Sequence, residues 1–259
     1  MKLGFEEAQT AFVSASQQAR VWTERWVADW MFCPNCGAAR LNQFPANSPV
    51  ADFFCQSCSD QFEVKSKNGK SFGKSVADGA YDAKIARLSS KTNPNLLLLG
   101  YSKLAREVHN VCIVPKHFFV PDIIQKRKPL AETARRKGWV GSNILLANVP
   151  EAGRIFVLRN GVVEPKDQVL AKWKETLFLR RTNIEARGWL LEVMKAVDLI
   201  GRPEFDLDDV YSHEARLSAV YPNNNNVRPK IRQQLQVLRD NGYLEFVGKG
   251  HYRLRAGRL

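Results

Sequence analysis

The 259-residue sequence predicts an α/β domain followed by a smaller, mainly helical domain. Helical and strand-like stretches alternate over residues 1–180, and two Cys-x-x-Cys pairs interrupt this part near its start. The hydrophobic pattern then changes at Trp189. These observations predict domains over residues 1–180 and 188–259, joined by a linker at 180–188.

Within the first domain, alanines and tryptophans at helical spacing predict a helix over residues 5–32. Phe62-Glu63-Val64-Lys65 alternates apolar and charged residues, as a half-buried strand does. Asp78-Gly79 is typical of a helix start, so we expect a second helix up to Leu88. Further strands are expected at residues 96–99, 111–114 and 155–158, with a hairpin turn at Asn160-Gly161.

The second domain has the pattern of three helices followed by a hairpin. The helices are indicated by apolar residues in the stretches 190–200, 207–217 and 231–238, the last ending at Asn241-Gly242. Two short strand-like stretches flank Gly248-Lys249-Gly250. Three helices and a terminal hairpin predict a winged helix.

The four cysteines of the two pairs have the spacing of a four-thiolate zinc site. Cys33 and Cys36 form the first pair, Cys55 and Cys58 form the second, and 18 residues separate the pairs. Four thiolates leave no open coordination position, so we expect the zinc to be structural. The fifth cysteine, Cys112, lies in an apolar stretch and is expected to be buried.

The charge balance favours a polyanionic partner. The chain carries a net charge of +13, and only 11 of its 39 lysines and arginines lie in residues 188–259, together with 9 of its 26 acidic residues. We therefore expect the first domain to make most phosphate contacts. The sequence has no apolar run that would span a membrane and no signal-peptide layout, so we expect a cytoplasmic protein. We further expect a bacterial protein that is monomeric in solution.

Asp52, Glu63 and Lys65 predict a metal-dependent nuclease site around the second cysteine pair. Glu63 and Lys65 are two apart and project from the same strand face, while Val64 points into the core and can offer its backbone carbonyl to a metal. Carboxylates could hold a magnesium ion that stabilises charge on the transferring phosphate, with Lys65 beside the attacking water. The alternative interpretation is an unrelated set of charges on a solvated strand.

Several blocks of the chain resemble, in order, the DpnI family of methyl-directed restriction endonucleases. They are Cys33-Pro34-Asn35-Cys36-Gly37, Val50-Ala51-Asp52-Phe53, Phe62-Glu63-Val64-Lys65-Ser66-Lys67, Lys128-Pro129-Leu130-Ala131, Ala134-Arg135-Arg136, Gly138-Trp139 and Ile231-Arg232-Gln233-Gln234-Leu235-Gln236. The resemblance implies a PD-(D/E)XK restriction-endonuclease-like core with an inserted zinc site and a C-terminal winged helix. It further implies magnesium-dependent cleavage of double-stranded GATC sites only when the adenine carries an N6-methyl group.

The same resemblance assigns Asp52, Glu63 and Lys65 to the active site. The magnesium ligands are then Asp52, Glu63 and the Val64 carbonyl. Ala51 stands where the family pattern usually has proline, a change that the pattern tolerates.

A methylated adenine presents an apolar bump in the major groove, which calls for a shaped hydrophobic contact. Residues 121–143 are charged and lack periodicity, so we interpret them as a surface loop that faces DNA through Arg135 and Arg136. The resemblance points to Trp139 in this loop as a methyl contact; the alternative is an ordinary core tryptophan. On the third helix of the winged helix, Arg232, Gln233 and Gln236 face outward and suit contacts to bases or phosphates, although any solvated helix face has this composition.

Two other functions fit parts of the sequence. The chain could be a transcription regulator, in which a zinc ribbon and a winged helix bind DNA without catalysis. It could also be a nuclease of different specificity, such as a repair or methylcytosine enzyme.

Overall fold

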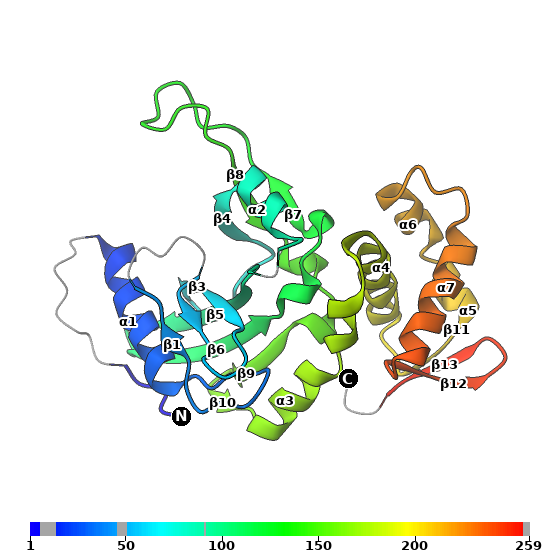
Figure 1. The fold of residues 1–259 in the computed structure, drawn as a ribbon, viewed down its shortest axis with the longest axis horizontal. Coiled ribbons are helices and arrows are strands. Elements are labelled where there is room, and N and C mark those ends of the chain that lie inside the picture. Colours follow the sequence, from blue (N-terminus) through cyan, green and yellow to red (C-terminus); the bar gives the residue numbers. More distant parts are fainter. Residues whose placement is uncertain (6–13, 46–50, 91, 256–259) are drawn as a thin grey trace. The chain divides into compact units, whose positions relative to one another are not determined.

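The computed structural model describes residues 1–5, 14–45, 51–90 and 92–255 (Figure 1). It divides into two compact units. The first comprises Met1–Ala147 and Gly153–Lys174, and the second comprises Asn148–Ala152 and Glu175–Leu259. The short segment of the second unit is held there by the backbone N–H of Glu151, which donates to Asp198 at 2.8 Å. The division into a nuclease domain at residues 1–180 and a winged-helix domain at 188–259 stays a prediction.

The first unit is built on a seven-stranded sheet with the order β1-β2-β3-β5-β6-β9-β10. In that order the strands are Asn42–Gln43, Phe53–Phe54, Gln61–Asn68, Asn95–Ser102, Glu107–Val114, Ile155–Arg159 and Val162–Val163. β3 pairs with β5 in parallel and with β2 antiparallel. β5 and β6 are covered on both faces, so they read as nearly continuous apolar runs in which Leu97, Val111 and Ile113 are completely buried.

Two helices belong to this sheet. Helix α1 (Ala15–Trp30) packs beside β3 and buries Trp22 and Trp26, and helix α3 (Lys166–Lys174) packs on β9 and buries Trp173. The helix predicted over residues 5–32 is confirmed over Ala15–Trp30 and is shorter than predicted, since Phe5, Met31 and Phe32 are not helical; residues 6–13, including Ala11, lie outside the described part. The strands predicted at 62–65, 96–99, 111–114 and 155–158 and the turn at Asn160-Gly161 are confirmed.

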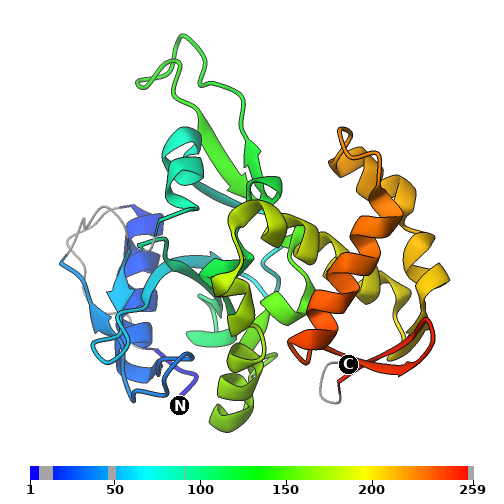
Figure 2. The same cartoon turned by 45° about the vertical axis from the view of Figure 1, so that its right-hand side comes forward.

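A three-stranded sheet in the same unit has the order β4-β8-β7. Its strands are Val76–Ala80, Gly141–Ile144 and Ile124–Lys126, and helix α2 (Tyr81–Arg87) follows β4 directly. The connection between β7 and β8 projects beyond the end of these strands (Figures 1 and 2).

Short 3-10 helices of the two units occupy Lys116–Phe118, Pro121–Ile123, Leu146–Asn148, Glu151–Gly153 and Leu177–Arg181.

This small sheet corrects two predictions. Asp78 does not begin a helix, because residues 76–80 pair with β8 and the helix starts three residues later. Residues 121–143 are not wholly a loop, since both ends of the stretch pair as β7 and β8. In both cases the pairing partner is distant in sequence, so local composition could not indicate it.

The second unit consists of four helices and a three-stranded sheet of order β11-β13-β12. The helices are α4 (Ile184–Ile200), α5 (Leu207–Tyr211), α6 (Glu214–Val220) and α7 (Val227–Asp240), and the strands are β11 (Glu204–Asp206), β12 (Leu244–Gly248) and β13 (His251–Leu254). The predicted hairpin and third helix are confirmed. The second helix is split at Ser212-His213, and β11 adds a strand to the hairpin.

The predicted linker at residues 180–188 is wrong. Asn183 caps α4 by accepting from the N–H of Ala186 at 2.8 Å, and Arg187 and Gly188 are buried within the helix. Arg187 and Gly188 interrupt the apolar pattern, so the pattern did not indicate the first turn of α4. Within the described residues, none of the helices combines the length and apolar character that crossing a bilayer requires.

Packing of α7 predicts a large effect of truncating its core face. Leu238→Ala removes a fully buried side chain and should lower the free energy of unfolding by about 2 to 5 kcal/mol through lost burial and a cavity. Leu199→Ala on α4 is the matched control, because that side chain is 62% exposed. Chemical denaturation monitored by circular dichroism measures both, and equal effects of the two variants would contradict this packing.

Candidate active site

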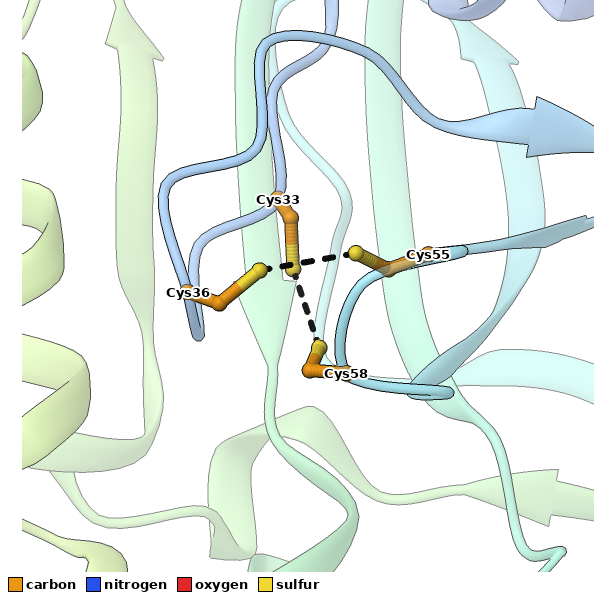
Figure 3. Close-up of side chains that lie close together, drawn as sticks. All are labelled: Cys33, Cys36, Cys55 and Cys58. Atoms are coloured by element: carbon orange, nitrogen blue, oxygen red, sulfur yellow. Dashed lines mark hydrogen bonds between the residues drawn. The ribbon is translucent and has the colours of Figure 1, made fainter.

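The four paired cysteines converge on one point (Figure 3). The Sγ atoms of Cys33 and Cys58 are 3.6 Å apart, those of Cys36 and Cys55 are 3.5 Å apart, and all four lie within 4.8 Å of one another. A tetrahedral zinc with Zn–S bonds of about 2.3 Å separates its sulfurs by about 3.8 Å. The cluster therefore has the size that a zinc ion requires.

Both cysteine pairs are held by the same local structure. In each, the residue after the second cysteine has a positive φ, at Gly37 (77°) and Ser59 (60°), and its N–H donates at 2.8 Å to the carbonyl of the first cysteine. In each turn, the N–H of the first cysteine donates a second backbone hydrogen bond, also of 2.8 Å, which closes the turn. Each turn therefore orients its own two sulfurs through local backbone hydrogen bonds.

Burial raises the pKa of the Cys33 and Cys58 thiols. Thiols that resist ionisation when buried become stable thiolates when a divalent cation neutralises them. The residues present thus suit a structural zinc. The second turn also joins β2 to β3, so a bound zinc would brace the start of β3.

Asp52 lies immediately before β2, and two hydrogen bonds connect it to β3. Its backbone N–H donates to the carbonyl of Phe62 at 3.0 Å, and its Oδ2 accepts from the N–H of Val64 at 2.8 Å. The N–H and C=O of one strand residue face the same side, so the Val64 carbonyl points toward this edge as well. The Asp52 carboxylate therefore contacts the residue that stands directly between Glu63 and Lys65.

Glu63 and Lys65 share one face of β3, as predicted, and touch each other. Lys65 Nζ lies 2.7 Å from Glu63 Oε1, and both side chains are partly exposed. Lys65 aligns with Leu98 on β5, Cys112 on β6 and Phe156 on β9, so these residues form one row across the sheet. Glu63, Val64 and Lys65 are adjacent on β3, and Asp52 joins them through its hydrogen bond to Val64.

Two residues join this group that the sequence did not identify. Asp78 on β4 lies 3.1 Å from Lys65 Nζ, and Lys84 on α2 lies 2.7 Å from Asp78 and 3.5 Å from Glu63. Burial alone would raise the pKa of Asp78, but the ammonium groups of Lys84 and Lys65 outweigh it and lower that pKa below its usual value. Sequence reasoning missed both because Asp78 was interpreted as a helix start.

A second cluster of charges surrounds Asp52 on its other side. Arg20 on α1 donates to Asp52 Oδ1 at 3.0 Å and also pairs with Glu24 one helical turn later. Glu24 in turn accepts from Gln43 at 2.9 Å. Helix α1 therefore holds the outer oxygen of Asp52 through an arginine.

A cavity of about 440 Å³ is lined by Leu98, Cys112 and Phe156, which belong to the same row as Lys65. The cavity therefore lies on the face of the sheet that carries Lys65. Four cationic side chains also line it: Lys70, Lys74, Arg154 and Arg159. This concentration of positive charge beside β3 favours a polyanion on that face.

Trp139 lies in the connection between β7 and β8, near Arg135 and Arg136. Arg136 covers its ring at 4.6 Å from the centroid, and both arginines are exposed while Trp139 is half-buried. Gly141 leaves room for the ring, since a Cβ there would meet it at 2.8 Å. Trp139 is therefore not a core residue, and it presents part of an aromatic surface among cations.

Arg232, Gln233 and Gln236 are exposed on one side of α7 in the second unit, as predicted. Ile231, Leu235 and Leu238 on the other side are fully buried. Arg232 donates to the hydroxyl of Tyr211 at 3.0 Å, which orients its guanidinium. The two sets of predicted DNA contacts thus belong to separate units.

Zinc content should depend on the cluster and on no other cysteine. Wild-type protein is expected to contain one zinc per chain, and Cys33→Ser should lose the metal and melt at a lower temperature, because structural zinc contributes directly to folding. Cys112→Ala, which removes a thiol outside the cluster, should keep the zinc. Elemental analysis with thermal unfolding measures both properties; full zinc occupancy in Cys33→Ser would contradict the assignment.

Comparison with known families covers nearly the entire chain. Residues 1–182 match the Dam-replacing family, described as DpnI, and residues 185–254 match the Dam-replacing helix-turn-helix domain. The family implies a nuclease, and the second match indicates DNA binding. With its mixed α/β sheet, its C-terminal helical domain and a four-cysteine cluster that could hold zinc, this chain belongs to the Dam-replacing (DpnI) family.

Proposed function

We propose that the protein is a magnesium-dependent restriction endonuclease that cleaves double-stranded DNA at GATC sites containing N6-methyladenine. The observation that supports this most directly is the arrangement on β3. Lys65 contacts Glu63 at 2.7 Å, and Asp52 contacts the residue between them at 2.8 Å. Family membership supports the nuclease class, and the resemblance of the motifs supports the methylated GATC site.

The donor atoms at this edge suit magnesium, which takes oxygen ligands. The carboxylates of Asp52 and Glu63 and the carbonyl of Val64 would hold the ion. When bound, such an ion stabilises the charge that develops on the transferring phosphate. Lys65 then orients the attacking water through its ammonium, and the neighbouring cations Lys70 and Lys74 attract the DNA backbone.

Discrimination of one methyl group demands more than a single contact. Burying a methyl is worth about 0.8 kcal/mol, and a pocket distinguishes one extra carbon by about 1 to 3 kcal/mol. We therefore propose that both units read the methylated site, the first through Trp139 and the second through the exposed side of α7. Arg135 and Arg136 position the first contact by binding phosphate.

A regulator that binds DNA without chemistry is the main alternative, and it makes a different prediction for Lys65→Ala. We expect this variant to bind methylated duplex normally but to cleave it at least about 10²-fold more slowly, because a preorganised charge at the reacting phosphate is lost. Lys174→Ala, an exposed lysine on α3, is the control and should cleave at the wild-type rate.

The assay uses dam-methylated and unmethylated plasmid with magnesium, and binding is followed by gel shift. No cleavage by wild-type protein would favour the regulator, and equal cleavage of both plasmids would favour a nuclease of different specificity. Unchanged cleavage by Lys65→Ala would remove Lys65 from the mechanism.

Reading by both units predicts a partial effect of Trp139→Ala. Loss of the ring should reduce the preference for methylated over unmethylated GATC by about 10-fold or more, while the contribution of α7 preserves some preference. Trp139→Phe, which keeps an aromatic surface, should retain most of the preference. Cleavage rates on matched duplexes with and without the methyl group measure it. An unchanged ratio in Trp139→Ala, or a ratio of one, would contradict reading by both units.

A further inference from the structure

Four charged side chains near β3 form a closed ring of alternating sign. Starting at Glu63, the ring runs to Lys65 at 2.7 Å, to Asp78 at 3.1 Å, to Lys84 at 2.7 Å and back to Glu63 at 3.5 Å. Its two halves differ in exposure. Glu63 and Lys65 are 21% and 27% exposed, whereas Asp78 and Lys84 are 4% and 8% exposed. DNA can approach the first pair, and the second pair forms the support behind it.

Asp78 is held firmly in place. It lies on β4, opposite Ser142 of β8, and the Ser142 hydroxyl donates to the carbonyl of the next residue, Gly79, at 3.0 Å. Lys84 projects from α2 and lies 5.2 Å from the centroid of the Phe119 ring. Neither residue of the buried pair belongs to the seven-stranded sheet, so the ring connects β3 to the small sheet and to α2.

The carboxylates of Glu63 and Asp78 have different roles when a divalent ion is bound. Glu63 must give oxygen to the ion, which weakens its attraction for Lys65, and the ion itself repels the ammonium. The Asp78 carboxylate has no such competitor, because it is buried and faces only the two lysines among the ion pairs of the described residues. Without Asp78, two lysines would share one carboxylate with a metal ion.

We propose that Asp78 is a positioning residue, which holds the ammonium of Lys65 at the reacting phosphate while Glu63 binds the divalent ion. This inference rests on the proposed nuclease function. Lys84 is the second cation beside the buried Asp78 carboxylate, in addition to Lys65.

The alternative is that Asp78 and Lys84 form an ion pair that only stabilises the fold. Two variants distinguish these roles. Asp78→Asn leaves the two lysines with one carboxylate, and it could lower stability for that reason alone. Asp78→Asn/Lys84→Met removes one charge of each sign, which restores the balance and should recover the melting temperature, but Lys65 still lacks its second carboxylate.

Single-turnover cleavage of methylated duplex with magnesium measures the effect, together with the affinity for the same duplex in calcium and thermal unfolding. We expect Asp78→Asn to cleave about 10²-fold more slowly at saturating enzyme with unchanged affinity, since small displacements of a catalytic group have this cost. The double variant should stay slow although its stability recovers. Lys84→Met alone, which keeps the contact of Asp78 with Lys65, should cleave clearly faster than either.

Asp82→Asn is the matched control, because this exposed aspartate on α2 lies outside the ring and should leave the rate unchanged. Wild-type cleavage by Asp78→Asn, or recovery of rate with stability in the double variant, would overturn the proposal while the nuclease function stands. No cleavage of methylated duplex by the wild-type protein would instead overturn the proposed function and this inference with it.

Discussion

The hydrogen bond from the Val64 N–H to the Asp52 carboxylate marks the place where the candidate site is assembled. β2 pairs with β3 only at Gln61 and Phe62, so Val64 has no partner residue in β2. A strand N–H without a ladder partner needs another acceptor, and the Asp52 side chain supplies it. Because β2 does not extend opposite Val64, the Val64 carbonyl also lacks a partner in β2 and faces outward. An interrupted strand pairing thus places a carboxylate and a carbonyl side by side.

The four-cysteine cluster and the charge ring secure the two ends of this arrangement. The turn of Cys55 and Cys58 connects β2 to β3, so a metal there would limit how far Asp52 can move relative to Glu63. The ring extends from β3 to β4, which is hydrogen-bonded to β8 at the end of the connection that carries Trp139. The segment around Trp139 that is proposed to read the methyl group is therefore connected to the proposed catalytic strand through β8, β4 and the charge ring.

Local features of the sequence were sufficient for several elements. The spacing of the cysteines predicted their cluster because each pair lies in a short turn that is closed by its own backbone hydrogen bonds, and two such pairs are typical of a zinc site. The alternation at Phe62-Glu63-Val64-Lys65 predicted that Glu63 and Lys65 share a face, since strand geometry alone requires it. The periodicity of α7 separated Ile231 and Leu235 from Arg232 and Gln236 for the same reason.

The sequence by itself determined the face shared by Glu63 and Lys65 and the exposed side of α7, because both depend on the geometry of a single strand or helix. It also determined the four cysteines of the cluster, because their spacing is that of a known kind of zinc site, although the two pairs meet across 19 to 25 residues. Only the tertiary structure decided that Asp78 is a strand residue and that Lys84 reaches Glu63. Both depend on pairing between β4 and β8, whose partners lie more than 60 residues apart. The dipeptide Asp78-Gly79 is typical of a helix start, and nothing in the local sequence distinguishes a helix start from a strand there. Long-range strand pairing overrode the local preference, and it brought the buried half of the charge ring to the site.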